Sequence, residues 1–522
     1  MSSPNNTPAI LRSLIVYAVS VPLAILVGYL LTSVNNYDVE SIGIIGFVMA
    51  VLIFPVLMKW HYPWLLFSWS SPFLIFFLPG RPGLFLVMVA ASLSISVVER
   101  ILNSRLRFLS APQVTWPLVA LLGVIVMTAE LTGGLGFRSM GSSVYGGKKY
   151  ALLFIGILSF FALIARPIPK EKAKLYVSLF LLGSALNFIQ DLYVVIPAPL
   201  RIIYLLFGAS GAGMDAMGNA DFEMGRTAAA GFAATGGALA SLMLMLYTVR
   251  GIFMGRKLWR PVVFAGLICM LLLGGQRGPL ISFAGLFALL FWLEGLHRSR
   301  LMLPFATAGV VGAILIAVFS AHLPYTFQRA IAFLPVEIDI EARRSADDST
   351  EWRLNIWKAV LPQVPEHLLL GTGLAISVET LNETAGRSDI KVIDAANQPL
   401  ALAHDMHNGP LSIILPFGIW GVLAWLWFWA GGFYVLRRNY IYGDPDLKNY
   451  NRYLLAAFVS GCIFFTLIFG VMESIGTFCG FIGLSVALNH GVRGPARQTN
   501  PAAVRVARGP LADRPRPVLL PR

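Results

Sequence analysis

The stretch Leu301–His322, LMLPFATAGVVGAILIAVFSAH, decides the fold class. Its 22 residues carry no charged side chain before the final histidine. An α-helix rises about 1.5 Å per residue, so this stretch is about 33 Å long and can cross a hydrocarbon core of about 30 Å. Comparable apolar runs recur from near residue 10 almost to residue 490. The sequence therefore predicts an all-α, polytopic transmembrane helical bundle of twelve to fourteen spans.

The composition supports the same class. Apolar residues make up 57% of the 522-residue chain and charged residues only 13%, with a mean hydropathy of +0.72. A soluble domain is about 45–50% apolar and about 25% charged, so that class is excluded. The three cysteines lie in or beside apolar runs and give no basis for a disulfide framework. In a membrane protein the net charge of +14 indicates topology, and we expect no nucleic-acid partner.

The placement of Lys and Arg predicts the orientation. Basic segments such as ERILNSRLR, RGIFMGRKLWR and the tail after His490 fall on one side of the predicted spans. The positive-inside rule makes that side cytoplasmic and places both termini there. Four regions are expected: an N-terminal transmembrane bundle at 1–322, a large periplasmic loop at 323–406, C-terminal transmembrane helices at 407–490, and a basic, disordered cytoplasmic tail at 491–522.

The large loop is long enough to hold structure of its own, and we expect it to be partly helical. Its segment STEWRLNIWKAVLPQV (residues 349–364) has the spacing of a helix. Ser349 or Thr350 is suited to cap its start. The predicted apolar face consists of Leu354, Trp357, Val360 and Leu361.

Candidate chemistry gathers on the predicted outer face. Arg277 lies in GGQRGPL at a junction of two spans, Arg353 lies in the large loop, and His404, Asp405 and His407 close that loop. An arginine offers a rigid fork of donors suited to phosphate oxygens, and a histidine can exchange a proton near neutral pH. Together they could bind and activate a phosphate leaving group at the membrane surface.

Each of these residues also has a structural interpretation. Arg277 could extend toward lipid headgroups from a helix end. Arg353 could pair with an acidic neighbour, Glu351 or Asp348, or face water. The two histidines could be ordinary polar residues at a loop end. These alternatives stay open at the level of residue types.

Metal and nucleotide sites are both disfavoured. Zinc usually needs three or four protein ligands, and the other outer histidines, His322 and His367, are isolated in the sequence. The glycine-rich GASGAGMDAMG lacks the Gly-Lys-Ser/Thr ending of a P-loop. We therefore expect no metal and no cofactor.

Three motifs in one order resemble the O-antigen ligase and polymerase family. HNGPLSIILPFGIWGVLAW resembles a His-Asn-x-x-Leu then Gly-x-x-Gly signature, EWRLNIWKAVLPQVPEHLLLGTGLAIS resembles a loop pattern of Arg, Trp, Pro and Gly-x-Gly, and GGQRGPL resembles an Arg-Gly element. The matching positions are His407, Asn408, Leu411, Gly418, Gly421, Arg353, Trp357, Pro365, Gly371, Gly373 and Arg277. The resemblance covers roughly residues 271–484.

The resemblance implies a membrane glycosyltransferase of the bacterial inner membrane. Such enzymes move a glycan from an undecaprenyl-diphosphate carrier to a saccharide or lipid-saccharide acceptor at the periplasmic face, in surface polysaccharide biosynthesis. Carried over to this sequence, His407, Arg277 and Arg353 are the candidate catalytic residues. Both arginines, with Asn408 and His404, are the candidate substrate-binding residues. The lipid bilayer and other membrane proteins of polysaccharide assembly are the remaining expected partners.

One departure and two other functions accompany this resemblance. The acid usual near the first glycine of the Gly-x-x-Gly element is replaced by Pro416, and a proline inside this helix must kink or open it.

A transporter or flippase of lipid-linked glycan would instead place an ionisable cavity midway through the bundle and show inverted repeats. A non-catalytic envelope-assembly protein would use the large loop to bind a protein partner.

Overall fold

The computed structural model describes residues 55, 59–76, 78, 81–135, 144–208, 229–300, 302–377 and 406–495. The first two expected spans, the end of the large loop with His404 and Asp405, and the tail beyond residue 495 lie outside the described residues.

The described residues confirm an all-α, polytopic helical membrane protein. Among them, nine helices are long and apolar enough to cross a membrane, and three shorter apolar helices accompany them. The number of spans for the whole chain stays a prediction. Two strands of two residues each, β1 (Val144–Tyr145) and β2 (Ile376–Ser377), pair antiparallel and tie the large loop to the start of α5.

The described helices divide into those that are long and apolar enough to cross a membrane and those that are not. The helices of membrane length are α3 (Leu84–Leu102), α4 (Pro112–Leu131), α5 (Gly147–Ile164), η2, α6 and η3 in succession (Lys170–Lys172, Ala173–Leu182, Gly183–Val194), α9 (Ala230–Phe253), α12 with η6 (Met302–Phe319, Ser320–His322), α17 (Gly409–Tyr442), η8 with α18 (Pro445–Leu447, Lys448–Leu467) and η9 with α19 (Met472–Ser474, Ile475–Asn489). The others are η4 with α7 (Ala198–Ile203, Tyr204–Phe207), α10 (Trp259–Leu272), α11 (Arg277–Leu293), η5 (Leu296–Arg298), α13 (Tyr325–Ile331) and α14 with η7 (Ile340–Val360, Leu361–Gln363).

The core of the bundle lies around α17, which packs against α4 and α18, while α19 packs against α5 and α9 against α10. Trp425 of α17 is almost fully buried and stacks on Phe465 of α18, with ring centroids 5.2 Å apart. A Cβ on Gly431 would lie 1.9 Å from the Gln113 carbonyl oxygen of α4. A small residue here lets the two backbones approach, as is common between membrane helices.

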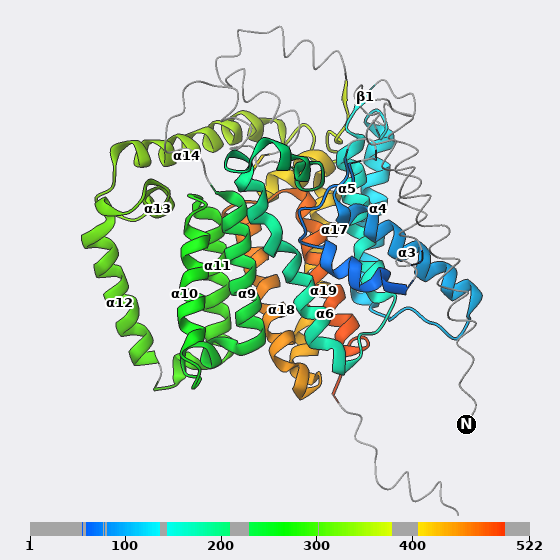
Figure 1. The fold of residues 1–522 in the computed structure, drawn as a ribbon. Helices are drawn as coiled ribbons and strands as arrows, with labels where there is room; N and C mark the ends of the chain where they lie inside the picture. The colour runs from blue at the N-terminus through cyan, green and yellow to red at the C-terminus, as the bar shows by residue number, and fades with distance from the viewer. Residues whose placement is uncertain are drawn as a thin grey trace, which may run out of the picture.

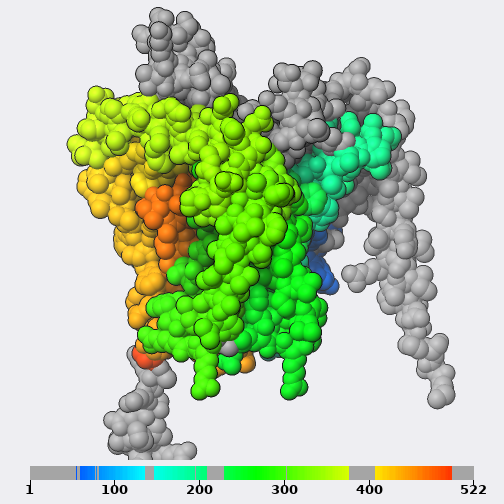
Figure 2. All heavy atoms as spheres, turned by 90° about the vertical axis from the view of Figure 1, so that its left-hand side faces the viewer, coloured from blue at the N-terminus to red at the C-terminus, as the bar shows by residue number. Residues whose placement is uncertain are grey.

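One side of the bundle carries α12, which has no buried residue and is apolar along its length. In Figure 1 it stands at the edge of the bundle, and α14 lies across the end from which α12 leads into α13. Figure 2 looks at this side and shows the yellow-green atoms of the same region over the top of the molecule. The loop helices therefore cover one end of the bundle.

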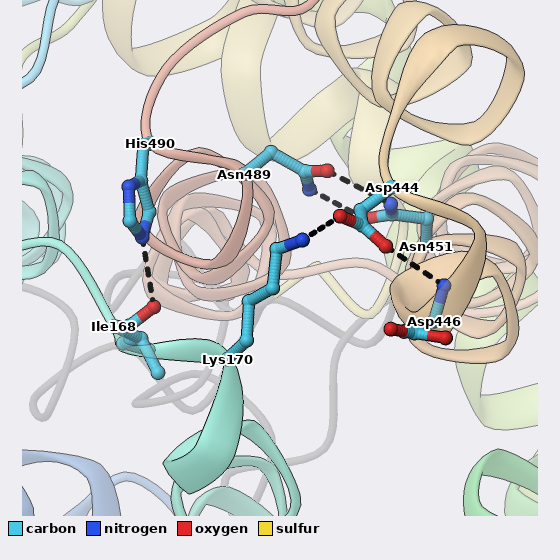
Figure 3. A network of polar contacts seen from close by, with 7 residues as sticks. All are labelled: Ile168, Lys170, Asp444, Asp446, Asn451, Asn489 and His490. Carbon is cyan, nitrogen blue, oxygen red and sulfur yellow. Dashed lines mark hydrogen bonds and ion pairs between the residues drawn. The ribbon is translucent and has the colours of Figure 1, made fainter.

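The opposite end of the bundle is fastened by polar contacts, shown in Figure 3. The side-chain amides of Asn489 and Asn451 exchange two hydrogen bonds, of 2.7 and 3.1 Å, which join α19 to α18. Lys170, in the connection after α5, forms an ion pair with Asp444, just after α17. The amide pair therefore holds α18 and α19 together, and the ion pair fixes the connection between α5 and α6 against the end of α17.

Candidate functional site

The loop helix α14 begins earlier than the sequence predicts. Asp339 caps it, and its Oδ1 accepts a hydrogen bond of 2.7 Å from the Glu341 amide. The predicted caps, Ser349 and Thr350, lie inside the helix, where their hydroxyls donate to backbone carbonyls one turn earlier, at 2.9 and 3.1 Å. The predicted cap is therefore wrong. Residues 340–348 are already helical, and Asp339 caps the helix at their start.

The face by which α14 packs on the bundle also differs from the predicted one. Ile356 and Val360 are buried against the first turns of α17, whereas Leu361, assigned to the apolar face, is 60% exposed. The indole of Trp357 donates a 2.8 Å hydrogen bond to the Met406 carbonyl. This bond ties α14 to the chain just before His407.

Arg277 joins the start of α11 to α14. Two residues before it, Gly275 has a φ of 59°, in the left-handed region that glycine adopts at little cost. The guanidinium of Arg277 donates to the Ala346 carbonyl at 3.0 Å and to the Thr350 hydroxyl. Arg277 therefore points away from the bilayer interior and toward the loop helix, and snorkelling alone does not explain its position.

Arg353 lies one turn beyond Thr350 on α14 and faces the same space. Its Nε is buried and has no hydrogen-bond partner among the described residues. Burial lowers the pKa of this guanidinium, and the charge of Arg277 lowers it further. Guanidinium groups keep their proton in proteins, so Arg277 and Arg353 are both cations here. No hydrogen bond from the Arg353 Nε offsets this charge among the described residues. The alternative interpretation of Arg353 was an ion pair with Glu351 or Asp348. Neither ion pair is formed among the described residues.

His407 is held in an uncommon backbone conformation. Its φ of 49° is left-handed, which costs a residue other than glycine roughly 1–2 kcal/mol. The imidazole meets the Trp352 ring at 5.1 Å and the Phe469 ring at 4.7 Å between centroids, both edge to face. Strain of this kind persists only where the surroundings fix it, and it is frequent at functional sites. The aromatic pair therefore sets the direction of the imidazole.

Asn408, expected to bind substrate, serves as the N-cap of α17. Its side-chain oxygen accepts a 3.1 Å hydrogen bond from the Leu411 amide. The next residue, Gly409, packs so closely that a Cβ would lie 2.2 Å from the Phe465 ring. In the His-Asn-Gly sequence, His407 has a strained backbone, Asn408 caps α17, and Gly409 packs closely on Phe465. The cap fixes where α17 starts and so where His407 lies.

The break predicted for the helix beneath the site is confirmed. α17 is interrupted at Gly418, whose φ is 58°, two residues after Pro416. The large loop repairs the break: the amides of Thr372 and Gly373 donate to the Leu415 and Pro416 carbonyls, both at 2.9 Å. The break at Gly418 frees these carbonyls, and backbone groups freed by a break in a membrane helix must find such partners.

Gly371 allows this approach of the loop. Its φ is 75°, and a Cβ there would lie 2.2 Å from the Pro416 carbonyl oxygen. On the other side of the break, the Ile419 amide donates to the Leu368 carbonyl at 2.7 Å. The Gly-x-Gly element therefore docks the loop on the broken helix.

A cavity of about 790 Å³ brings the candidate residues together. Arg277, Arg353 and His407 all line it, and so does Arg329 of α13, which the sequence analysis did not identify. Arg329 donates to the Ser349 hydroxyl at 3.4 Å. No aspartate or glutamate is among the described residues that line the cavity. Three guanidinium groups line this space and no carboxylate lines it among the described residues, an arrangement that favours an anion of high charge.

Comparison with known families agrees with this geometry. The O-antigen ligase family matches residues 261–426. This segment belongs to that family. The O-antigen ligase segment contains all three arginines and His407, while the cavity wall from Phe464 to Phe469 lies beyond it. No curated protein sequence matches the chain.

The sequence carried no signal for Arg329. It lies in a short loop helix outside the quoted motifs, and only the packing of α13 against α14 and α11 turns it toward the cavity.

Proposed function

We propose that the protein transfers a glycan from a polyprenyl-diphosphate carrier to a saccharide or lipid-saccharide acceptor. The O-antigen ligase segment supports an O-antigen ligase-like glycan transferase, and the cavity supports the finer assignment. The observation that carries it is the convergence of three arginines and one histidine on a space with no acidic described residue. Undecaprenyl diphosphate at the periplasmic face of a bacterial inner membrane is the donor that the motifs imply.

The three arginines would hold the diphosphate. In the reaction a hydroxyl of the acceptor attacks the anomeric carbon of the donor sugar, and the bond from that carbon to the diphosphate oxygen breaks. Negative charge then collects on the departing diphosphate. Fixed positive charge that is already in place stabilises such a leaving group without reorganisation. Arg353 lines the cavity, and its buried Nε has no partner among the described residues, so this guanidinium would contribute its charge to the diphosphate.

His407 would act on the acceptor. Its ring lines the same cavity as the arginines, and the Trp352 and Phe469 rings fix its direction. The attacking hydroxyl loses its proton as the new bond forms, and His407 accepts or orients that proton. General base catalysis of this type contributes about 10²–10⁴ in rate. The diphosphate is already a good leaving group, so positioning by His407 is a sufficient role.

The remaining wall of the cavity suits a lipid-linked donor. Phe464 and Leu467 of α18, with Ile468 after it, form an apolar part of the lining. A diphosphate headed by a sugar and followed by an isoprenoid chain presents the same change from polar to apolar. A free sugar nucleotide would not need this wall.

The test is transfer by the purified protein in nanodiscs, with a polyprenyl-diphosphate-linked glycan and a saccharide acceptor. We expect product from the wild type and at least a tenfold lower rate from His407→Ala. His322→Ala is the matched control, because His322 is exposed at the end of α12 and does not line the cavity. No transfer by the wild type, together with movement of intact donor across liposomes, would favour a transporter instead.

A further inference from the structure

A second pocket, of about 750 Å³, lies between the helix of residues 59–68 and the segment that joins α5 to α6. We call it the Lys59 pocket. Its lining consists of three cations, four tyrosine or tryptophan rings and several apolar residues: Lys59, Trp60, Tyr62, Pro63, Trp64, Phe67, Arg166, Pro167, Pro169, Lys172, Leu175, Tyr176 and Leu179. None of these residues lines the cavity that contains Arg277, Arg353 and His407.

The Lys59 pocket lies at the other end of the bundle from His407. Helix α17 starts beside His407 and ends at Tyr442, and the next residues include Asp444. Asp444 pairs with Lys170, which stands between Arg166 and Lys172 in the chain. The pocket is therefore at the end that the Lys and Arg distribution predicts to be cytoplasmic.

The lining changes in the same order along both walls. On one wall Lys59 and Trp60 come first, followed one and two turns later by Trp64 and Phe67. On the other wall Lys172 comes first, followed by Leu175 and then Leu179 of α6. Each wall thus begins with a cation and becomes apolar toward the middle of the bundle. A phospholipid offers the complementary order of phosphate, glycerol esters and acyl chain.

The floor of the Lys59 pocket is organised by internal contacts. Arg166 forms an ion pair with Glu99, and the Tyr62 hydroxyl donates to the Leu163 carbonyl at 2.8 Å. Tyr62 is 4% exposed and lies against the Tyr176 ring, with centroids 5.9 Å apart. Arg166 is therefore already neutralised and positions the floor, which leaves the lysines as the charges available to a ligand.

The rim of the pocket is open and cationic. Lys59 and Lys172 are exposed, and neither has a carboxylate partner among the described residues. Trp60 is 52% and Trp64 41% exposed, as expected of indoles at a membrane interface. Cationic pockets between membrane helices on the cytoplasmic side bind anionic lipid headgroups. We propose that the Lys59 pocket binds an anionic glycerophospholipid, with its phosphate between Lys59 and Lys172 and an acyl chain along Trp64, Phe67 and Leu179.

Native mass spectrometry of the purified full-length protein tests this proposal. Phosphatidylglycerol is titrated against phosphatidylcholine with the same acyl chains. We expect the wild type to prefer phosphatidylglycerol, and the double variant Lys59→Gln, Lys172→Gln to bind it about 25-fold more weakly, because each lysine near a bilayer surface contributes roughly fivefold. The matched control is Arg256→Gln, Lys257→Gln, since both residues are exposed in the α9–α10 connection and lie outside the pocket.

Three results would overturn the proposal. They are equal binding of the two lipids by the wild type, unchanged phosphatidylglycerol binding by the Lys59, Lys172 double variant, and complete displacement of phosphatidylglycerol by excess inorganic phosphate, which would identify a site for a soluble anion. Because the two lysines are exposed, the variant should keep its elution volume in size-exclusion chromatography. A second variant, Trp64→Ala, tests the apolar wall and should weaken phosphatidylglycerol binding while both lysines remain.

Discussion

Gly371→Ala should release the large loop from the broken helix beneath the site. The glycine has a φ of 75°, which costs an alanine roughly 1–2 kcal/mol. The new methyl group would also lie 2.2 Å from the Pro416 carbonyl oxygen, so the loop must move. Movement breaks the bonds that Thr372 and Gly373 donate to α17, each worth about 1 kcal/mol. The docked state should therefore lose about 3–4 kcal/mol, or a factor of about 10²–10³ in its local equilibrium.

Hydrogen exchange measured by mass spectrometry reports this opening directly. We expect amides at residues 371–373 and 419 to exchange at least 100-fold faster in Gly371→Ala. Glycan transfer should fall as well, because Trp357 and Arg353 belong to the same docked loop. Gly309→Ala is the control: Gly309 lies in α12 with nothing within 4 Å of its added Cβ, so exchange in the loop should not change. Unchanged protection at residues 371–373 in Gly371→Ala would refute the assigned role of this glycine.

Three further changes have defined outcomes. Arg329→Gln should lower the transfer rate about tenfold, since it removes one of three cations from the cavity. Arg344→Gln is the control, because Arg344 is an exposed residue of α14 outside the cavity, and its transfer rate should not fall. Equal rates for the two variants would remove Arg329 from the site. Transfer should persist in EDTA, because the arginines supply the charge that offsets the diphosphate, and loss of activity reversed by a divalent cation would contradict this. Asn408→Ala should lower the thermal midpoint through loss of about 1 kcal/mol of N-cap energy, whereas Asn408→Asp should retain the cap; identical melting of both variants would argue against capping.

The sequence predicts the membrane class from local signals, and it predicts three candidate site residues from charge placement and from the family motifs. Apolar length identifies spans, and residue type with charge placement brings Arg277, Arg353 and His407 to one end of the bundle. The structure puts these three on one cavity. It also shows α17 interrupted at Gly418, two residues after Pro416, so the predicted kink lies close to the proline.

Other features depend on packing between distant segments. The sequence predicts a later start for α14 because Asp339 and Ser349 are both acceptable caps. The longer helix brings Ala346 to Arg277 of α11 and Ile356 to the first turns of α17, and these contacts cannot be predicted from local sequence. Arg329 has no motif of its own. The role of Gly371 depends on a carbonyl of Pro416, brought there by the fold. Asn408 carries a motif signal but acts in the structure as a cap, because the same residue type suits both roles.

The transfer rate of Arg353→Gln tests the central claim most directly. Unlike Arg277, whose guanidinium also holds α14 in place, Arg353 lines the cavity, and its buried Nε has no hydrogen-bond partner among the described residues. Lys358→Gln is the matched control, because Lys358 is an exposed cation on the same helix and does not line the cavity. We predict at least a tenfold loss of transfer for Arg353→Gln, with the thermal midpoint kept and with wild-type transfer for Lys358→Gln. A folded Arg353→Gln protein that transfers glycan at the wild-type rate would contradict the assignment of this cavity to the diphosphate.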